Sequence, residues 1–210
     1  MSYVKTMLEN RITVGKGDVR STLGKGLSRA RVLAASSLAC LGWLTAACPQ
    51  AFSQSPDEFQ VKSAMVFNIT KYVEWPAESF PGKGAALTIC VVGTGPFGQA
   101  LESLKGTTVQ GRTVIVKHVS QTEEISACQV LVINNSERRQ LPAVLAKARQ
   151  HGVLSISDIP RFAQKGGIIG FVSQEGRIRL EVNLSSAQSS RIKISSQLLK
   201  LAKIVQEGDQ

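Results

Sequence analysis

The chain has 210 residues, 43% of them hydrophobic, and a formal net charge of +10, which suits one compact domain with an additional segment at one end. Seven of the 25 basic residues and two of the 15 acidic residues precede residue 54, so the remainder has a net charge of only +5. Because the basic residues of this remainder are scattered and form no dense block, a nucleic acid is excluded as the expected partner.

Residues 1–53 are predicted to be a signal peptide with a basic leader. The basic stretch 1–31 precedes 17 uncharged residues, 32–48, and small residues suited to cleavage follow at 51–53. This order is typical of a secretory signal. A retained membrane anchor is the alternative, but 17 residues that include serine, glycine and threonine barely span a bilayer. We therefore expect an exported domain over residues 54–210.

Helices in the exported part are predicted over residues 57–73, 96–104, 136–150 and 186–206. In the first of them, Val61, Met65 and Ile69 recur at helical spacing. The same spacing recurs near the C-terminus, in Ile194, Leu198, Leu201 and Val205. We therefore expect a long helix to close the chain.

Strands are predicted over residues 87–92, 113–119, 130–134, 153–157, 168–172 and 177–183. The run 87–92 is apolar throughout, which is typical of a strand buried on both faces. Residues 177–183 alternate instead, with Ile178, Leu180 and Val182 on one face, so the other face of that strand is expected to meet water. The link 173–176 is too short for a crossover and indicates an antiparallel hairpin.

This alternation of strands and helices predicts the α/β fold class. We expect a single domain with a mainly parallel sheet, helices on both faces, and a C-terminal β-hairpin followed by the long helix.

A glycine turn, Gly93–Gly98, follows the first of these strands and spells Gly-x-Gly-x-x-Gly, the outline of a dinucleotide-binding turn. The next strand ends in Lys117, His118 and Val119, without the acid that would hold a ribose. Pro96 also removes one amide donor from the loop. We therefore expect the turn to be structural, and small-ligand or nucleotide binding at Gly93–Gly98 stays the alternative.

Two cysteines, Cys90 and Cys128, remain after the leader is removed, and in an exported protein they most simply form one disulfide. His118 and His151 lie far apart in the sequence and have no adjacent carboxylate pattern, so a metal site has little support. No group of residues with the spacing of a catalytic site is present. We expect neither catalysis nor a cofactor.

The order of motifs along residues 57–205 resembles the YfiR-like family of exported bacterial proteins. The motifs are VKSAMVFNITKYVEWP, VVGTGPFG, GRTVIVKHV, CQVLVI, VLSISDIPRFAQKGGIIGFV and RIRLEVNLSSAQSSRIKISSQLLKLAKIV. The resemblance implies a periplasmic, non-catalytic negative regulator that tends to form a homodimer. It implies binding to the periplasmic domain of an inner-membrane diguanylate cyclase, which represses cyclic di-GMP synthesis and so limits biofilm. An OmpA-like outer-membrane lipoprotein is implied as the protein that sequesters the regulator.

The resemblance also implies roles for single residues. Cys90 and Cys128 match the pair that forms the main disulfide, whereas the second bridge of some relatives has no cysteines here. The partner-binding patch implied by the family maps to Ile169, Glu181, Ala187 and Val205. We expect Glu181 on the open face of its strand, while core packing is the alternative for Ile169 and Val205. For the partner, another sensor, such as a histidine kinase or an outer-membrane receptor, is the alternative.

Overall fold

The computed structural model describes residues 56–208, so the predicted leader, residues 1–53, lies outside the described residues. The helices of this part are α1 (Pro56–Thr70), α2 (Pro96–Ala100), α3 (Leu141–Gln150), α4 (Leu184–Ser189) and α5 (Ser196–Leu199). Short 3-10 helices are η1 (Ala77–Ser79), η2 (Leu101–Leu104), η3 (Thr122–Ala127), η4 (Asn135–Arg139) and η5 (Ala163–Lys165). The strands are β1 (Val73–Glu74), β2 (Leu87–Val92), β3 (Thr108–Val109), β4 (Arg112–Val119), β5 (Val130–Ile133), β6 (Leu154–Ser157), β7 (Ile169–Gln174), β8 (Arg177–Asn183), β9 (Lys193–Ile194) and β10 (Ala202–Val205).

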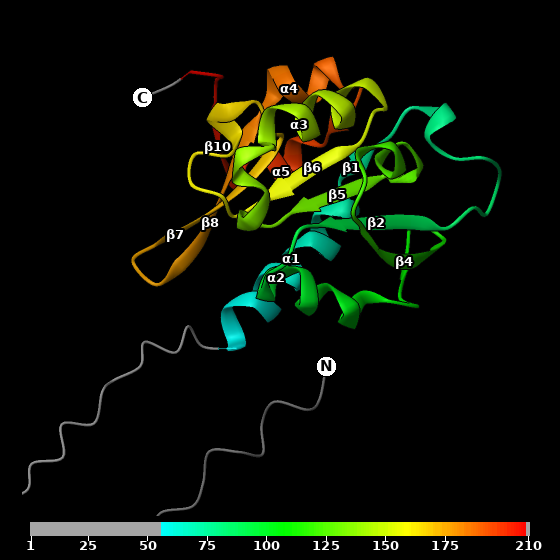
Figure 1. Ribbon diagram of the computed structural model, residues 1–210, viewed down its shortest axis with the longest axis horizontal. Helices are drawn as coiled ribbons and strands as arrows, with labels where there is room; N and C mark the ends of the chain where they lie inside the picture. Colours follow the sequence, from blue (N-terminus) through cyan, green and yellow to red (C-terminus); the bar gives the residue numbers. More distant parts are fainter. Residues whose placement is uncertain (1–55, 209–210) are drawn as a thin grey trace, which may run out of the picture. The chain divides into compact units, whose positions relative to one another are not determined.

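One sheet carries the fold, with strand order β10-β8-β7-β6-β5-β2-β4-β3 within residues 56–208 (Figure 1). The neighbours from β4 through β2, β5 and β6 to β7 are parallel, and β10 is parallel to β8. The pairs β7–β8 and β3–β4 are antiparallel, as their short connections require. The predicted fold class, a single α/β domain with a mainly parallel sheet, is confirmed.

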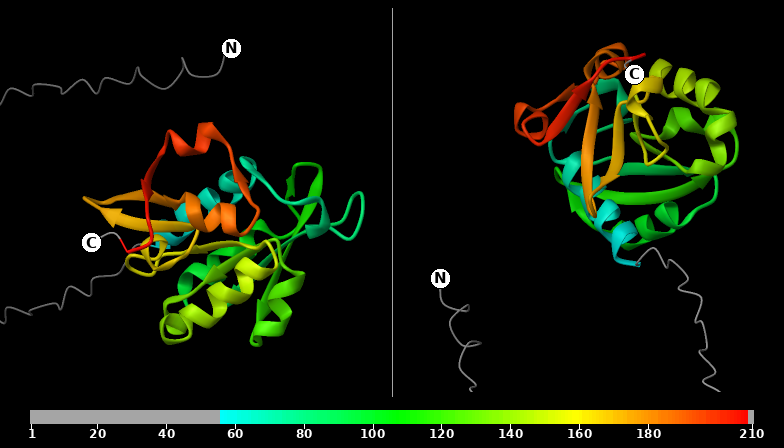
Figure 2. Two further views of the ribbon diagram at one scale, coloured as in Figure 1. Left: turned by 90° about the horizontal axis from the view of Figure 1, so that it is seen from above. Right: turned by 90° about the vertical axis from the view of Figure 1, so that its left-hand side faces the viewer.

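Helices cover both faces of the sheet (Figure 2). On one face, α1 and α2 contribute Val66, Ile69 and Phe97 to a core cluster that also contains Ile89 and Val132 of the sheet. On the other face, α3 belongs to a second cluster. Side chains of β2 and β5 belong to both clusters, which explains why these strands are apolar without alternation.

The segment after β8 corrects the predicted long helix. Residues 186–206 are divided among α4, β9, α5 and β10. The Ser195 side chain accepts a hydrogen bond from the Gln197 amide and caps a new helix, while Ile194 pairs with Val73 of β1. The chain then returns as β10, in which Ile204 lies beside Val182 of β8. The helical spacing therefore arises by chance across several short elements. The chain forms a strand here because β10 can pair with the edge of β8.

Candidate functional site

Two backbone amides of the glycine turn after β2 are hydrogen-bonded by the protein's own side chains. The Ser136 hydroxyl accepts a hydrogen bond from the Thr94 amide at 2.9 Å, and the Asn134 carboxamide oxygen accepts one from the Gly98 amide at 3.3 Å. A Cβ atom at Gly93 would come within 2.7–2.9 Å of the Glu137 side chain. The Glu137 carboxylate therefore lies beside the turn and would repel a nucleotide phosphate bound there. This geometry supports the prediction that the turn is structural.

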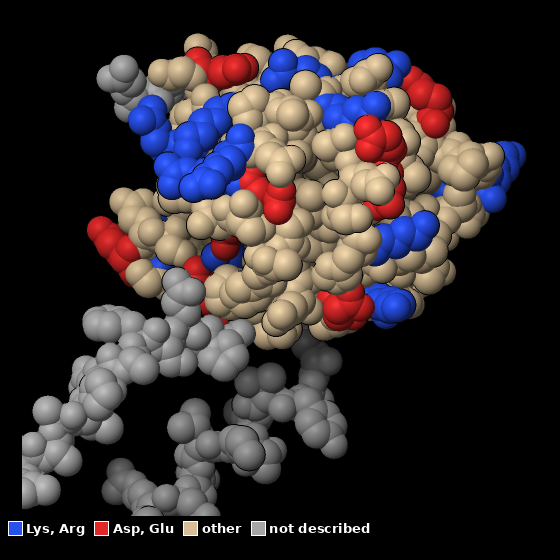
Figure 3. Space-filling view, viewed as in Figure 1, with Lys and Arg blue, Asp and Glu red and all other residues tan. Residues whose placement is uncertain are grey.

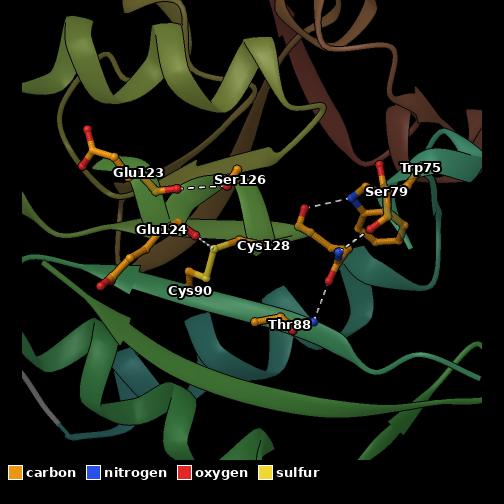
Figure 4. The surroundings of a disulfide bond; sticks show 9 residues. Trp75, Ser79, Thr88, Cys90, Glu123, Glu124, Ser126 and Cys128 are labelled. Atoms are coloured by element: carbon orange, nitrogen blue, oxygen red, sulfur yellow. Dashed lines mark hydrogen bonds between the residues drawn. A yellow bond between two sulfur atoms is a disulfide. The ribbon is translucent and has the colours of Figure 1, made fainter. Parts of the chain in front are cut away.

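The predicted disulfide is confirmed, because Cys90 of β2 and Cys128, just before β5, are bonded in the structure (Figure 4). Both cysteines are nearly inaccessible to solvent, at 1% and 3% exposure. The Cys128 sulfur lies 3.4 Å from the carbonyl oxygen of Glu124, a contact and not a hydrogen bond, since a disulfide sulfur carries no proton. The bond holds the start of β5 against the middle of its neighbour β2.

Gln129, the residue after this disulfide, connects three segments. Its carboxamide accepts a hydrogen bond from the Thr88 amide at 2.9 Å and donates one to the Ser79 carbonyl at 2.5 Å. Its own carbonyl accepts a hydrogen bond from the Trp75 indole at 2.8 Å. These bonds satisfy buried polar groups beside the disulfide, so its surroundings are built for rigidity.

A lysine of α1 is buried between two carboxylates. The Lys62 Nζ atom lies 2.8 Å from the Asp158 carboxylate and 2.9 Å from that of Glu58. Burial acts to lower the pKa of Lys62, but the hydrogen bonds and charges of Asp158 and Glu58 together outweigh it and raise that pKa. The hydrogen bond from Lys62 also lowers the pKa of Glu58, with a smaller contribution from the Ser173 hydroxyl. The cluster ties α1 to the ends of β6 and β7.

The residues of the implied partner-binding patch lie inside the domain. Ile169, Glu181, Ala187 and Val205 are 0%, 9%, 2% and 3% exposed, respectively. Ile169, Glu181 and Val205 lie on the neighbouring strands β7, β8 and β10, but Ile169 pairs with Val182 and so lies on the opposite face of the sheet from Glu181. Ala187 lies on α4. So little exposed surface leaves these side chains little area for direct contact with another protein.

The expectation that Glu181 lies on an open strand face is wrong. Its side chain is 11% exposed, and its carboxylate lies 3.7 Å from the Lys203 Nζ atom. Glu181 is opposite Lys203 in the pairing of β8 with β10. The added strand β10, which the sequence pattern did not predict, therefore covers this residue from the side.

The exposed apolar side chains at this end of the sheet were missed in the sequence. Leu201 is 76% exposed and Ile204 53%, both next to or within β10. The sequence pattern assigned Leu201 to the apolar stripe of a long helix, so its exposure was not expected. We call β10 together with Leu201 the β10 edge.

Neither a metal-binding cluster nor a membrane-spanning helix is found in the part of the chain that the structure describes. Residues 56–208 contain no group of three or more histidine, cysteine or acidic side chains placed to hold a metal ion. In the same range, no helix has the length and apolar character needed to span a bilayer. The β10 edge, with Leu201 and Ile204, is an exposed apolar surface of this α/β domain.

The chain belongs to the YfiR/HmsC-like family, because the model of that family matches residues 59–203. This family comprises periplasmic regulators and is regulatory rather than catalytic. The resemblance read from the ordered motifs is thereby confirmed.

Solved structures with partial similarity include three bacterial proteins. A conserved domain protein from Vibrio cholerae is 12% identical, with 70% of this chain and 59% of that chain covered and a TM-score of 0.45. An ABC domain in complex with L-Trp from Streptococcus pneumonia is 15% identical (57% and 55% covered, TM-score 0.41). A substrate-binding protein with adhesive properties from Clostridium difficile is 14% identical (58% and 55% covered, TM-score 0.43). This chain thus matches 55–59% of the length of those three chains, and no functional conclusion is drawn from these similarities.

Proposed function

We propose that this protein is an exported, non-catalytic regulator that binds the periplasmic domain of an inner-membrane diguanylate cyclase and represses cyclic di-GMP synthesis. The observation that carries the proposal is the family match, which extends over residues 59–203 and so includes nearly all of the described domain. Export through the leader in residues 1–53 and residence in the periplasm are part of the same proposal.

Repression of a membrane enzyme by a binding protein has a simple thermodynamic requirement. The regulator must bind the inactive state of the cyclase more tightly than the active state, because equal affinity for both states shifts nothing. To shift a cyclase from about 99% active to about 99% inactive, the regulator must bind the inactive state about 10⁴-fold more tightly, or by roughly 5.5 kcal/mol. A rigid domain suits this task, since little conformational entropy is lost on binding.

Rigidity is supported by the interior of the domain. The Cys90–Cys128 disulfide, the bonds of Gln129 and the buried Lys62 cluster each fasten elements that are distant in the sequence. The exposed apolar residues Leu201 and Ile204 supply the contact area that an interface needs at its centre. We also propose that the regulator forms a homodimer and that an OmpA-like outer-membrane lipoprotein sequesters it. Either association would lower the concentration of regulator that is free to bind the cyclase.

Reconstitution of the cyclase tests this proposal. The detergent-solubilised cyclase would be assayed for cyclic di-GMP synthesis with increasing amounts of the exported chain. We expect the rate to fall to a plateau as the chain saturates the periplasmic domain, and to be unchanged by an unrelated exported protein of similar charge. A rate that stays constant at concentrations where the two proteins are shown to be bound would contradict repression.

A further inference from the structure

The sheet ends at a strand whose outer edge is free among the described residues. β10 is the first strand in the order of the sheet and pairs only with β8, through the register Ala202–Leu180 to Val205–Asn183. No described strand pairs with its other side. An edge strand presents backbone N–H and C=O groups that can pair with one more strand.

The two faces of β10 differ in the side chains that they expose: Ile204 is exposed on one face, and Lys203 is exposed on the other, where Val205 is buried. Ala202 and Ile204 lie on the face of Leu180 and Val182, which belong to the core cluster under α1. Ile204 is nevertheless 53% exposed, so the apolar face of the sheet is not fully covered at its last strand. A further strand with an aliphatic residue opposite Ile204 would cover it.

The opposite face of the same edge is basic. The Lys203 side chain is 73% exposed and reaches the nearly buried carboxylate of Glu181. Arg179 is exposed on this face of β8, two residues before Glu181, and adds a second cation to it. Lysine and arginine side chains gather over this end of the sheet (Figure 3). An acidic side chain opposite Lys203 would complement this charge.

We propose that the β10 edge accepts an extended segment of a partner protein as an added strand, and that this segment alternates aliphatic and acidic side chains. Main-chain hydrogen bonds give such an interface its affinity, and the alternating side chains give it specificity. A second copy of this chain is a poorer occupant, because its β10 carries Lys203 and no acidic residue that could complement this charge. The inference rests on the proposed function in that the protein acts by binding, and it names the chemistry of the segment that is bound.

Peptide binding tests the β10 edge directly. The full chain, purified after export, would be mixed with a short end-blocked peptide of alternating glutamate and valine. Affinity would be measured by fluorescence anisotropy, and hydrogen exchange would be followed at the backbone amides of residues 201–205. We expect binding together with slowed exchange at these amides, and affinity on the order of tenfold weaker for a matched peptide of alternating lysine and valine.

Two controls separate strand addition from simple charge attraction. A glutamate–valine peptide interrupted by prolines keeps its charge but lacks the amide donors of a strand, and it should not bind. Lys203→Gln should remove the preference for glutamate over lysine, while Lys105→Gln, in an exposed loop, should keep it. The comparison of peptides on the unmodified chain stands even if a variant folds poorly.

Several results would overturn the inference. These are no binding, binding without slowed exchange at residues 201–205, or equal binding of the proline-interrupted peptide. Slowed exchange that grows with protein concentration and without peptide would show that a second copy occupies the edge, which also overturns it.

A strain test distinguishes this inference from the proposed function. If deletion of the gene raises cyclic di-GMP but an Ile204→Asp variant still represses fully, the β10 edge is excluded and the proposed function stands. If the peptide adds at β10 but deletion leaves cyclic di-GMP unchanged, the binding surface stands and the proposed function fails.

Discussion

Lys62 illustrates how a single charged residue can fix the position of a helix. Its side chain is 6% exposed, and it is held by Glu58 from its own helix and by Asp158 from the end of β6. The charge also lies 4.9 Å from the centre of the Phe59 ring. Since the attraction of a paired buried charge is lost when one partner is removed, the cost of breaking this cluster is large.

Lys62→Met is expected to lower the free energy of unfolding by about 3 kcal/mol at neutral pH, because Glu58 and Asp158 are left without their counter-ion. Urea unfolding followed by circular dichroism would measure it. The control, Lys117→Met at an exposed position of β4, should change stability by less than about 0.5 kcal/mol. Equal effects of the two substitutions would contradict a structural role for the buried cluster.

The same cluster predicts a pH dependence. The pKa of Glu58 is lowered from its ordinary value of 4.5, so its contribution is present above pH 4.5 and is lost as the pH falls through the lower pKa of the folded state. The pKa of Lys62 is raised from 10.5, so its contribution is complete below that pH. The stability difference between the unmodified chain and Lys62→Met should therefore be largest near neutrality and narrow below pH 4.5. A difference that is constant from pH 7 to pH 3 would disagree.

The limits of the sequence are clearest at Glu181. Alternation in residues 177–183 correctly predicted a strand with Leu180 and Val182 facing the core. It could not predict that Glu181 is covered, because burial on the second face depends on β10, which arrives from a different part of the chain. Ile169 and Val205 are buried, which agrees with the alternative that these two residues pack in the core.

At the scale of elements, the strands were the most predictable. The predicted strand 87–92 matches β2, and 177–183 matches β8, because a long apolar run and a strict alternation are each determined by local sequence. The closing segment was not predictable in this way. Leu198, Leu201 and Val205 have helical spacing, but the cap at Ser195 and the pairing with β1 and β8 decide the structure there.

The turn after β2 predicts a packing effect. A Cβ atom at Gly98 would come 2.6 Å from Val91 Cγ1 and 2.9 Å from the side-chain Nδ2 atom of Asn134. Gly98→Ala should therefore cost about 1–2 kcal/mol of stability, since overpacking outweighs the better helix propensity of alanine. Gly82→Ala, at a position with open space, is the control and should be nearly neutral. Micromolar binding of a dinucleotide in calorimetry, abolished by Gly95→Val, would instead restore the nucleotide alternative.

The disulfide closes a loop that contains β3, β4 and η3. The bonded residues are 38 positions apart, for which the chain-entropy model gives about 4 kcal/mol. The double variant Cys90→Ala with Cys128→Ala should lose roughly this amount in urea unfolding. Cys90→Ala alone also lacks the bond and should be similar, within about 1 kcal/mol. A double variant as stable as the unmodified chain would show that the bond does not hold the fold.

For the whole molecule, membership of the YfiR/HmsC-like family joins the fold to a regulatory task. The described domain offers a rigid sheet with an exposed edge, and its interior fastens α1, β2, β5 and β6 to one another. Under the proposed function, the domain acts through the state of the cyclase that it stabilises, so its concentration and its location determine its effect.

Cyclic di-GMP in living cells gives the most direct test of the central claim. The nucleotide would be extracted and quantified from the parent strain, from a strain in which this gene is deleted, and from the deletion strain that again expresses the chain with its leader. We predict a higher level on deletion and a return to the parental level on re-expression, with no return when residues 1–53 are omitted. An unchanged level in the deletion strain, with the cyclase present and active, would contradict the account.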